Sequence, residues 1–438
     1  MRFIMLKMNL SDLVSLYLEP AEAKSLDEAV KLEPKRGLFL NESRLGRDAF
    51  LSLFPKARPH PLVKNGVIYQ KEDYELGKHL LFDLGAYYIQ DPSAMMVASF
   101  LPPLEEGYVL DMAAAPGGKT IGYAFANPTA TILANDISYI RASELSSNVE
   151  RMGLGNIAVT SGDWKIAYSK YRHFFDRIIL DAPCSGSAMF RKNEAAKEDW
   201  SQGKVEKNAA IQEELLGYAY EMLSPGGYLI YSTCSFSKEE NQDQILSFLD
   251  QHEDMEIVSL KDDPSFFHPS SLKEAILLLP TRGDYEGQFI ALLHKKGEPT
   301  DKKLKVNTCP PSFLRLAKEY GIEDFSYLDK GGLYCLNRPL PISSLALLRY
   351  GIRVEEEGKP SFALARYLGK AKAIELNEKE ALAYLHGDLI PLQGENGFHP
   401  VSYQGFPLGQ VKIVNGQGKN HYPKGYRHQY QLPLFRLG

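Results

Sequence analysis

The sequence predicts an α/β protein, built on a central sheet of mainly parallel strands with helices on both faces. One observation supports this class, and a second predicts additional modules. From Tyr108 to about His294, short apolar runs alternate with helical patterns, which is typical of doubly wound sheets. The chain of 438 residues also exceeds one ordinary hydrophobic core, so modules appended to the central domain are expected.

The apolar runs predict seven strands, at residues 108–111, 131–135, 157–161, 177–180, 228–233, 257–260 and 289–293. In an open α/β sheet, ligands bind at the carboxyl ends of the strands. The side chains expected at that edge are Asp111, Asp136, Asp163, Asp181, Cys184 and Cys234. We therefore look for the chemistry there.

The first strand runs into a turn of small residues and then into a helix start. This turn is Ala113-Ala114-Ala115-Pro116-Gly117-Gly118-Lys119. Small residues let a ligand approach the backbone closely. Asp136 ends the next strand 19 residues after Gly117, near the offset of about 20 at which an acid meets ribose hydroxyls. A nucleoside-containing cofactor is therefore expected, whereas the missing upstream glycine of a Walker A loop disfavours a nucleotide triphosphatase.

Two cysteines each follow a buried strand, in Asp181-Ala182-Pro183-Cys184 and in Thr233-Cys234. A lone cysteine is more often a small buried hydrophobe, which is the interpretation we give to Cys309 and Cys335. Two thiols and an acid at one sheet edge match a specific chemical need instead. Residues 237–240 read Ser-Lys-Glu-Glu, a capping-box pattern that predicts a helix N-terminus whose dipole would favour a Cys234 thiolate.

Composition limits the remaining classes. Hydrophobic residues make up 44% and charged residues 24% of the chain, which excludes a disordered or fibrous protein. No segment has the length and apolarity of a membrane span or a signal peptide, so we expect a cytoplasmic protein with no membrane partner. The four cysteines form no CxxC pair and no cluster with histidine, so no metal site is expected.

Taken together, the Ala-Ala-Pro-Gly-Gly-Lys turn and the two cysteine segments resemble the Nol1/Nop2/Sun family of RNA cytosine-5 methyltransferases, over about residues 39–293. Residues 403–409 and 419–425 resemble the C-terminal module of its bacterial RsmF-type branch, which acts on 16S ribosomal RNA. The resemblance implies an S-adenosylmethionine-dependent methyltransferase (Rossmann-like) domain at 101–296. It also implies an N-terminal α+β RNA-binding extension at 1–100 and a C-terminal region at 308–438 that ends in a PUA-like RNA-binding module.

The resemblance also implies residue roles. Carbon 5 of cytosine is a poor nucleophile until a thiolate adds at carbon 6. Cys234 would be that nucleophile, Cys184 would assist release of the product, and Asp181 would contact the base at N3. The cofactor S-adenosyl-L-methionine would be bound by Ala113, Ala114, Ala115, Pro116, Gly117, Gly118, Lys119, Asp136 at the ribose, Asp163 near the adenine, and Asp181. Ala113 departs from the family, since many relatives have cysteine there.

RNA contacts must come from local patches, because the net charge is −5. Residues 401–438 hold five Lys or Arg and no acid, interleaved with aromatic residues. The expected contacts are Arg191, Lys192, Lys419, Lys424 and Arg427, with a further basic segment at 39–64 that includes Asn41 and Arg44. Asn193-Glu194 departs from the family pattern beside Lys192, because a proline usually follows there.

Other functions stay open at this point. A tRNA cytosine-5 methyltransferase would share every catalytic motif, and only the appended modules favour 16S ribosomal RNA or the small ribosomal subunit as partner. A non-enzymatic RNA-binding ribosome-assembly factor could retain the fold, although both cysteines and Asp181 are intact. A DNA cytosine-5 enzyme would need only the Pro-Cys thiol, and an amino-methylating enzyme would need none.

Overall fold

The computed structural model describes residues 10–15, 17–191, 197–299, 302, 304–342, 344–369, 373–427 and 430–435. Its largest sheet runs in the order β11-β12-β13-β9-β8-β5-β6-β7-β16, with β10 paired to β13. The parallel strands are β5 (Tyr108–Asp111), β6 (Thr131–Asp136), β7 (Ile157–Ser161), β8 (Phe175–Asp181) and β9 (Leu223–Thr233). The antiparallel strands are β10 (Met255–Val258), β11 (Phe266–Phe267), β12 (Ile276–Leu278), β13 (Gln288–Lys295) and β16 (Ala346–Tyr350).

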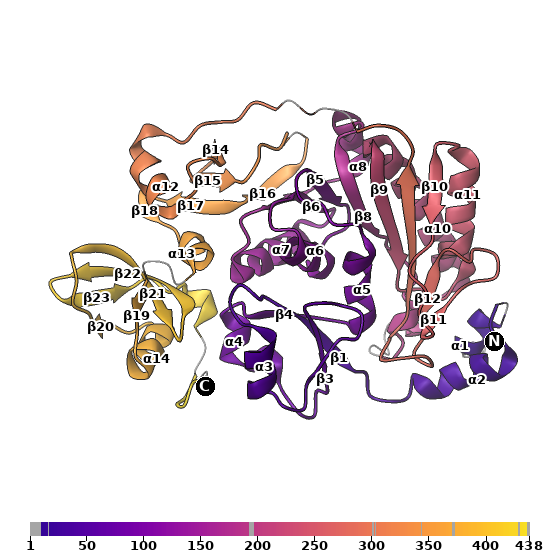
Figure 1. Cartoon of the computed structure of the whole chain (residues 1–438), viewed down its shortest axis with the longest axis horizontal. Helices are drawn as coiled ribbons and strands as arrows, with labels where there is room; N and C mark the ends of the chain where they lie inside the picture. The colour runs from indigo at the N-terminus through magenta and orange to yellow at the C-terminus, as the bar shows by residue number, and fades with distance from the viewer. Residues whose placement is uncertain are drawn as a thin grey trace, which may run out of the picture.

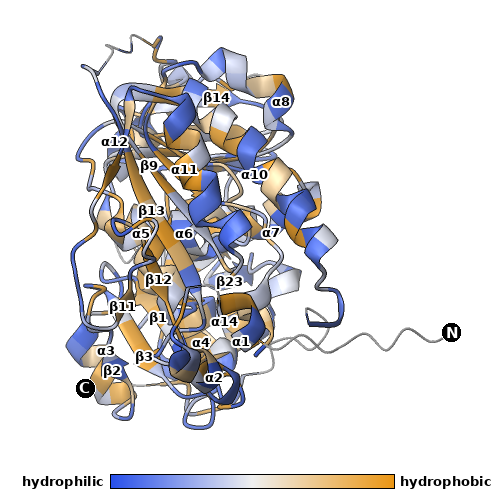
Figure 2. Ribbon diagram, turned by 90° about the vertical axis from the view of Figure 1, so that its right-hand side faces the viewer, coloured by the Kyte–Doolittle hydropathy of each residue, from blue (hydrophilic) through white to orange (hydrophobic). Residues whose placement is uncertain are grey.

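Successive residues of the parallel strands enter opposite cores, as the period of two along a strand requires. Leu110, Leu133 and Ile178 pack into one core with α8 (Trp164–Ala167), α10 (Gln202–Met222) and α11 (Gln242–Gln251). Their neighbours Val109 and Ile132 pack into the other with α5 (Pro92–Phe100), α6 (Gly118–Ala126) and α7 (Tyr139–Met152). Figure 2 shows the resulting hydrophobic band through β9, β12 and β13. The predicted α/β class with helices on both faces is confirmed.

Two features of this sheet differ from the expectation. The predicted strand 257–260 begins two residues earlier, as β10, and joins the sheet through an antiparallel pairing with β13. The far edge is closed by β16, which comes from the expected C-terminal region at 308–438 and pairs with β7. An open edge strand exposes unpaired backbone groups, and β16 satisfies those of β7. No local pattern in β16 indicated that distant partner.

The N-terminal part forms a separate four-stranded sheet in the order β2-β3-β1-β4. Its elements are β1 (Arg36–Leu40), α3 (Arg47–Leu53), β2 (Arg58–Pro59), β3 (Gly66–Tyr69), a short helix η1 (Leu76–Lys78), α4 (Leu80–Asp83) and β4 (Tyr87–Gln90). The preceding helices α1 (Leu10–Val14) and α2 (Pro20–Ala29) lie across the molecule, near β11 and β12 (Figure 1). There Arg282 holds the Glu22 carboxylate with two hydrogen bonds, of 2.6 and 2.8 Å.

The C-terminal part holds two further sheets. One has the order β14-β15-β17-β18 and the other β19-β21-β22-β23-β20. Their elements are α12 (Leu314–Tyr320), β14 (Ser326–Asp329), β15 (Leu333–Leu336), β17 (Ile352–Glu356), β18 (Lys359–Pro360), α13 (Phe362–Leu368), β19 (Ile374–Glu375), α14 (Glu378–His386), β20 (Ile390–Pro391), β21 (Gly397–Tyr403), β22 (Phe406–Val414) and β23 (Gln417–Asn420). The last sheet lies beside the N-terminal sheet (Figure 1), and Phe50 and Tyr87 share one core with Tyr403 and Phe406. The two appended modules therefore pack on each other.

Arg44 joins three parts of the chain. Its guanidinium donates to the carbonyl oxygens of Leu84 (2.6 Å), Arg151 (3.0 Å) and Arg366 (2.6 Å). The nearby Asn41 is buried and donates to the carbonyl oxygens of Gly85 and Met152, both at 3.1 Å. The expected RNA contact by these two residues is not supported, because their donors are satisfied inside the protein. Among the described residues, none of the helices combines the length and hydrophobicity that a bilayer crossing requires.

Candidate active site

The two cysteines of the sequence motifs meet at the carboxyl edge of the central sheet. β8 and β9 are parallel neighbours, with Asp181 opposite Ser232, so the loops that follow them leave the sheet side by side. The Sγ atoms of Cys184 and Cys234 lie 3.2 Å apart as free, partly exposed thiols. The structure thus brings together the two sulfur atoms that the motifs placed 50 residues apart in the sequence.

Cys184 lies in an environment that opposes ionisation. Its hydrogen bond to Cys234, its burial and the negative charges of Cys234, Glu240 and Asp181 raise its pKa well above the ordinary value. The Cys184 sulfur therefore keeps its proton in the unliganded protein. Since either sulfur can be the donor in this contact, a protonated Cys184 can donate to a Cys234 thiolate.

Asp181 is surrounded by hydrogen-bond donors. Its Oδ2 accepts from Lys119 Nζ at 2.6 Å, and its Oδ1 accepts from Ser232 Oγ at 2.6 Å and from Gln288 Nε2 at 3.2 Å. Burial opposes the charge of Lys119, yet the Asp181 carboxylate holds the pKa of that lysine above its ordinary value. The pair is therefore an ammonium and a carboxylate.

Lys119, Asp181 and Cys234 line one pocket of about 340 Å³. Its other walls come from the N-terminal module through Arg36 and Gln90, from the loop after β8 through Met189, and from the segment before β13 through Gly287. The sequence assigned Lys119 to the cofactor turn only, but its ammonium group lies on the cysteine side. This pocket is where a base could meet the Cys234 sulfur.

The small-residue turn lies between β5 and α6, as predicted. Gly117 has φ +115°, a conformation that other residues rarely adopt, and α6 begins at Gly118. The turn is fixed by Arg141, which donates to the carbonyl oxygen of Ala115 at 2.6 Å. Trp164 Nε1 also donates to the carbonyl oxygen of Met112 at 3.0 Å.

Two buried carboxylate oxygens beside this turn have no hydrogen-bond donor among the described residues, Asp111 Oδ1 and Asp136 Oδ2. Each acid uses its other oxygen, which accepts from Thr120 Oγ1 at 2.6 Å and from Ser138 N at 2.9 Å respectively. Arg141 Nη1 lies 3.4 Å from Asp136 Oδ2 without forming a hydrogen bond. Buried acceptors of this kind are normally satisfied, so they fit a ligand that carries O–H or N–H groups.

The other predicted acids differ in exposure. Burial raises the pKa of Asp111 to about 7, whereas Asp163 is exposed and accepts from Lys165 N at 2.9 Å at the start of α8. Among the described residues, no three His, Cys, Asp or Glu side chains are grouped so as to hold a metal ion. The edge thus offers unpaired buried carboxylate oxygens beside the small-residue turn and a thiol pair near Asp181.

The predicted capping box after Cys234 is wrong. The Ser237 side chain makes no cap hydrogen bond, the segment begins as a short turn η4 (Lys238–Glu240), and α11 follows only at Gln242. Glu240 does not reach back to the backbone of Ser237. Its carboxylate instead accepts hydrogen bonds from Ser185 and Ser235, which stand next to the two cysteines. These donors satisfy the carboxylate, and the backbone N–H of Ser237 donates to Ser235 Oγ at 3.1 Å instead.

The predicted RNA contacts divide into two groups. Arg191 is nearly buried, and its guanidinium donates to the carbonyl oxygens of Leu32 (2.6 Å) and Glu33 (2.7 Å) and approaches Glu286 (3.3 Å). This placement does not support an RNA contact, because Arg191 ties the segment before β1 to the catalytic domain. Lys192 lies outside the described residues.

Lys419, Lys424 and Arg427 are exposed on the C-terminal module, as an RNA contact would require. Arg427 also donates to the carbonyl oxygen of Tyr422 at 3.2 Å. Several aromatic residues of the same segment are not available for base stacking, because Tyr403, Phe406 and Tyr422 are buried in the module core.

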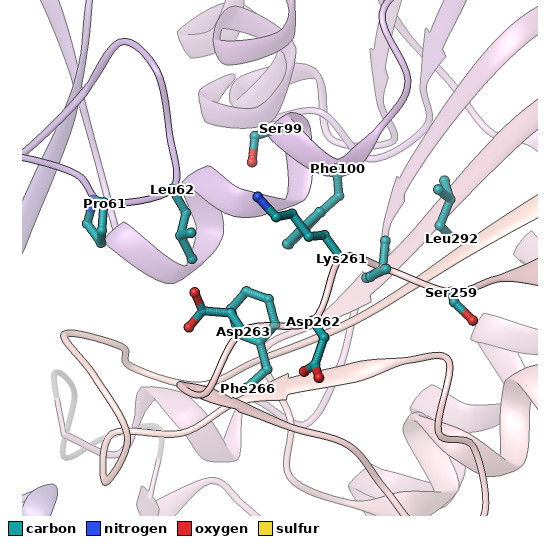
Figure 3. A pocket seen from close by; sticks show the side chains of 11 residues that line it. Pro61, Leu62, Ser99, Phe100, Ser259, Lys261, Asp262, Asp263, Phe266 and Leu292 are labelled. Carbon is teal, nitrogen blue, oxygen red and sulfur yellow. The ribbon is translucent and has the colours of Figure 1, made fainter.

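A larger pocket, of about 460 Å³, opens away from the cysteines, between the end of α5 and the segment after β10 (Figure 3). Its walls include Phe100 and Leu62 on one side and Lys261, Asp263 and Phe266 on the other. No cysteine and no residue of the cofactor turn lines it. Size alone therefore does not mark the active site in this protein.

Comparisons with known proteins agree with this arrangement. The family described as 16S rRNA methyltransferase RsmB/F matches residues 98–294, and the one described as methyltransferase RsmF PUA domain matches residues 371–428. Ribosomal RNA small subunit methyltransferase F of Shewanella loihica is 32% identical over 404 residues, 84% of this chain and 83% of that protein. The protein of the same name from an Enterobacter species is 30% identical and covers 89% of each chain.

Among solved structures, a methyltransferase homologue from Pyrococcus horikoshii is 29% identical, with a TM-score of 0.55. The match covers 65% of this chain and 98% of that one. Together with the family matches, it confirms the methyltransferase fold of the central sheet and the PUA-like module near the C-terminus.

Proposed function

This chain belongs to the ribosomal RNA small subunit methyltransferase F family, and on that premise we propose that it methylates carbon 5 of a cytosine in 16S ribosomal RNA. The observation that carries the proposal is the pair of sulfur atoms 3.2 Å apart, beside the carboxylate of Asp181. Methylation of an exocyclic nitrogen needs no thiol, whereas carbon 5 becomes nucleophilic only after a nucleophile adds at carbon 6. A thiol pair of which one sulfur, that of Cys234, lines the pocket supports the second chemistry.

The methyl donor is S-adenosylmethionine, which supplies an electrophilic methyl group when bound. The turn from Ala113 to Gly118 lets such a ligand lie against the backbone. The free oxygens of Asp111 and Asp136 are the acceptors that its hydroxyl and ammonium groups would satisfy. We assign Asp136 to the ribose and Asp163 to the neighbourhood of the adenine.

Cys234 acts as the nucleophile. Its sulfur forms a bond to carbon 6, and the electrons of the ring double bond move to carbon 5, which then accepts the methyl group. Asp181 and Lys119 face the same base. The ammonium of Lys119, which Asp181 holds at 2.6 Å, donates a hydrogen bond toward N3 and keeps its proton. This positive charge stabilises the electrons that the attack moves into the ring, and so makes carbon 6 more electrophilic.

Cys184 completes the reaction by removing the proton from carbon 5, after which the bond between the Cys234 sulfur and carbon 6 breaks. The causes of its raised pKa indicate the order of events. The hydrogen bond to Cys234 and the negative charge of Cys234 are both lost once that sulfur is bonded to carbon. The pKa of Cys184 then falls, so the thiol releases its proton to solvent after the attack and, as a thiolate, can take the proton from carbon 5.

The appended modules select the RNA in this proposal. Residues 101–296 carry the catalytic domain, while residues 1–100 and 308–438 hold the surroundings of the target. A stacked cytosine cannot reach the pocket, so the base must be flipped or presented in a loop. A tRNA substrate would use the same catalytic groups, but the match of the C-terminal module to an RsmF PUA domain favours ribosomal RNA.

Bisulfite sequencing of total RNA from cells with and without the gene tests the proposal. We expect one or more 5-methylcytosines of 16S ribosomal RNA to disappear and to return with the wild-type gene but not with Cys234→Ala. Loss of a tRNA signal instead would retain the mechanism and overturn the substrate. No lost signal would favour a non-enzymatic assembly factor.

A further inference from the structure

Glu240 places a fully buried carboxylate between the two cysteine loops. Its Oε1 accepts from the backbone N–H of Ser185 at 2.7 Å, and its Oε2 accepts from Ser185 Oγ and Ser235 Oγ, both at 2.5 Å. Ser185 directly follows Cys184, and Ser235 directly follows Cys234. One carboxylate therefore holds the residue after each cysteine.

The Glu240 carboxylate is balanced by hydrogen bonds rather than by a cation. Within the part of the chain that the structure describes, no Lys, Arg or His forms an ion pair with it. Its fourth donor is Gln212 Nε2, at 3.4 Å, which also donates to the carbonyl oxygen of Pro183 at 2.8 Å. Burying a carboxylate without a cation costs several kcal/mol, and charge-assisted hydrogen bonds recover part of that. A residue that only filled space could be apolar here.

Glu240 does not line the pocket that contains Cys234, so it does not meet the base. Any effect of Glu240 on the reaction is therefore transmitted through the two cysteines. Besides fixing the two loops, its negative charge is one of the causes that raise the pKa of Cys184, after the hydrogen bond to Cys234, burial and the charge of Cys234. Its position therefore affects both the distance between the sulfur atoms and the proton that they share.

We propose that Glu240 is a positioning residue for methyl transfer. Its buried carboxylate fixes the position of the loop after Cys184 relative to the loop after Cys234, so that both sulfur atoms act on the same base. This inference rests on the proposed function only in its last step. The pairing of the two thiols can be measured without RNA.

The first experiment measures the pairing directly. Diamide takes two electrons and two protons from two thiols, and a disulfide bond forms between the sulfur atoms. At 3.2 Å, Cys184 and Cys234 should oxidise rapidly in the wild-type protein, as mass spectrometry of the linked peptides would show. In Glu240→Gln we expect the reaction to slow about tenfold, because the amide cannot accept all of these hydrogen bonds. Glu239→Gln, the same change on the same turn, should leave the rate unchanged.

The second experiment measures methyl transfer in the same proteins. Misplacing reacting groups by about 1 Å can lower a rate about 100-fold, so Glu240→Gln should lower kcat at least tenfold. The KM values for RNA and S-adenosylmethionine should stay the same, because Glu240 touches neither. Loss of its charge should also move the thiol-dependent limb of the pH–rate profile to lower pH. A purely structural role would leave that limb in place in the folded fraction.

Ser235→Ala provides a second variant in case Glu240→Gln does not fold, since it removes one donor and keeps the carboxylate. Slower oxidation together with a lower kcat in either folded variant supports the proposal. Wild-type rates in both assays overturn it. If the wild-type protein methylates no cytosine, the proposed function fails, and the oxidation rates alone decide whether Glu240 pairs the thiols.

Discussion

Cys184 and Cys234 are identical side chains that the fold places in different environments. Cys184 is held by a hydrogen bond, by burial and by nearby negative charge in a form that keeps its proton. The proposed mechanism uses that asymmetry, since one sulfur attacks carbon 6 and the other waits for the proton at carbon 5.

Removing the Cys184 sulfur should therefore have the opposite effect on adduct formation from removing the Cys234 sulfur. Cys184→Ala should accumulate a covalent enzyme–RNA adduct, because the attack proceeds but the release of the product is slowed. Cys234→Ala should form no adduct. Denaturing gel electrophoresis of the enzyme with labelled RNA and S-adenosylmethionine measures this. The reverse pattern would exchange the two roles.

Asp111 predicts a pH dependence of stability. Burial raises its pKa to about 7, so the folded protein holds a proton that the unfolded chain releases above about pH 4. The folded state therefore loses stability as the pH rises from about 4 to 7. The Asn side chain of Asp111→Asn cannot ionise. The free energy of unfolding of this variant should therefore exceed that of the wild type by on the order of 3 kcal/mol at pH 8, but by little at pH 4.

Urea unfolding of the cofactor-free protein at the two pH values checks this expectation. Asp163→Asn is the control, because that carboxylate is exposed. A variant at Asp111 that is less stable than the wild type at pH 8 would contradict it.

The turn between β5 and α6 is the element to which we assign the cofactor site. Gly117 takes a positive φ, and a Cβ atom there would lie 2.8 Å from Leu145 Cδ1. The backbone can therefore present its N–H groups at the start of α6 only with glycine at this position.

Gly117→Ala should lower the affinity for S-adenosylmethionine at least tenfold and destabilise the protein by about 1–3 kcal/mol. Isothermal titration calorimetry and thermal melting measure the two effects. Gly203→Ala provides the matched control, since that glycine lies in the first turn of α10 with open space around it. It should be neutral or slightly stabilising. Normal cofactor binding by Gly117→Ala would contradict our assignment of the turn.

The whole molecule is tied together by contacts between distant parts. Arg44 bonds to three segments, β16 completes the central sheet, and the two appended modules share a core. Arg191 likewise binds the segment before β1. Basic residues of this protein thus divide into buried ones that hold its parts together and exposed ones, which are the candidates for RNA contact.

The exposed cations of the C-terminal module should carry RNA affinity. Replacing Lys419, Lys424 and Arg427 together by Gln should weaken binding and reduce the slope of log affinity against log salt by about 2–3. Each phosphate contact that is made releases counterions from the RNA, so losing contacts lowers the number released. Filter binding at several salt concentrations measures the slope. A triple Gln variant at the exposed Lys24, Lys207 and Lys261 is the control. Equal effects in both variants would contradict a specific role for this module.

The sequence by itself determined the α/β class, seven strands of the central sheet, the small-residue turn after the first of them, and the two cysteines with Asp181 at one sheet edge. These features are local, since each depends on strand periodicity or on residues adjacent in the chain. Glycine at position 117 and the acids at the strand ends belong to this group.

Only the tertiary structure decided which side chains meet. The pairing of β16 with β7, the burial of Arg44 and Arg191, and the ammonium of Lys119 on Asp181 depend on segments far apart in the sequence. The capping pattern at residues 237–240 failed for the same reason. The Glu240 carboxylate had better donors in a loop 55 residues away, and hydrogen bonds in a buried site outweigh a local backbone preference.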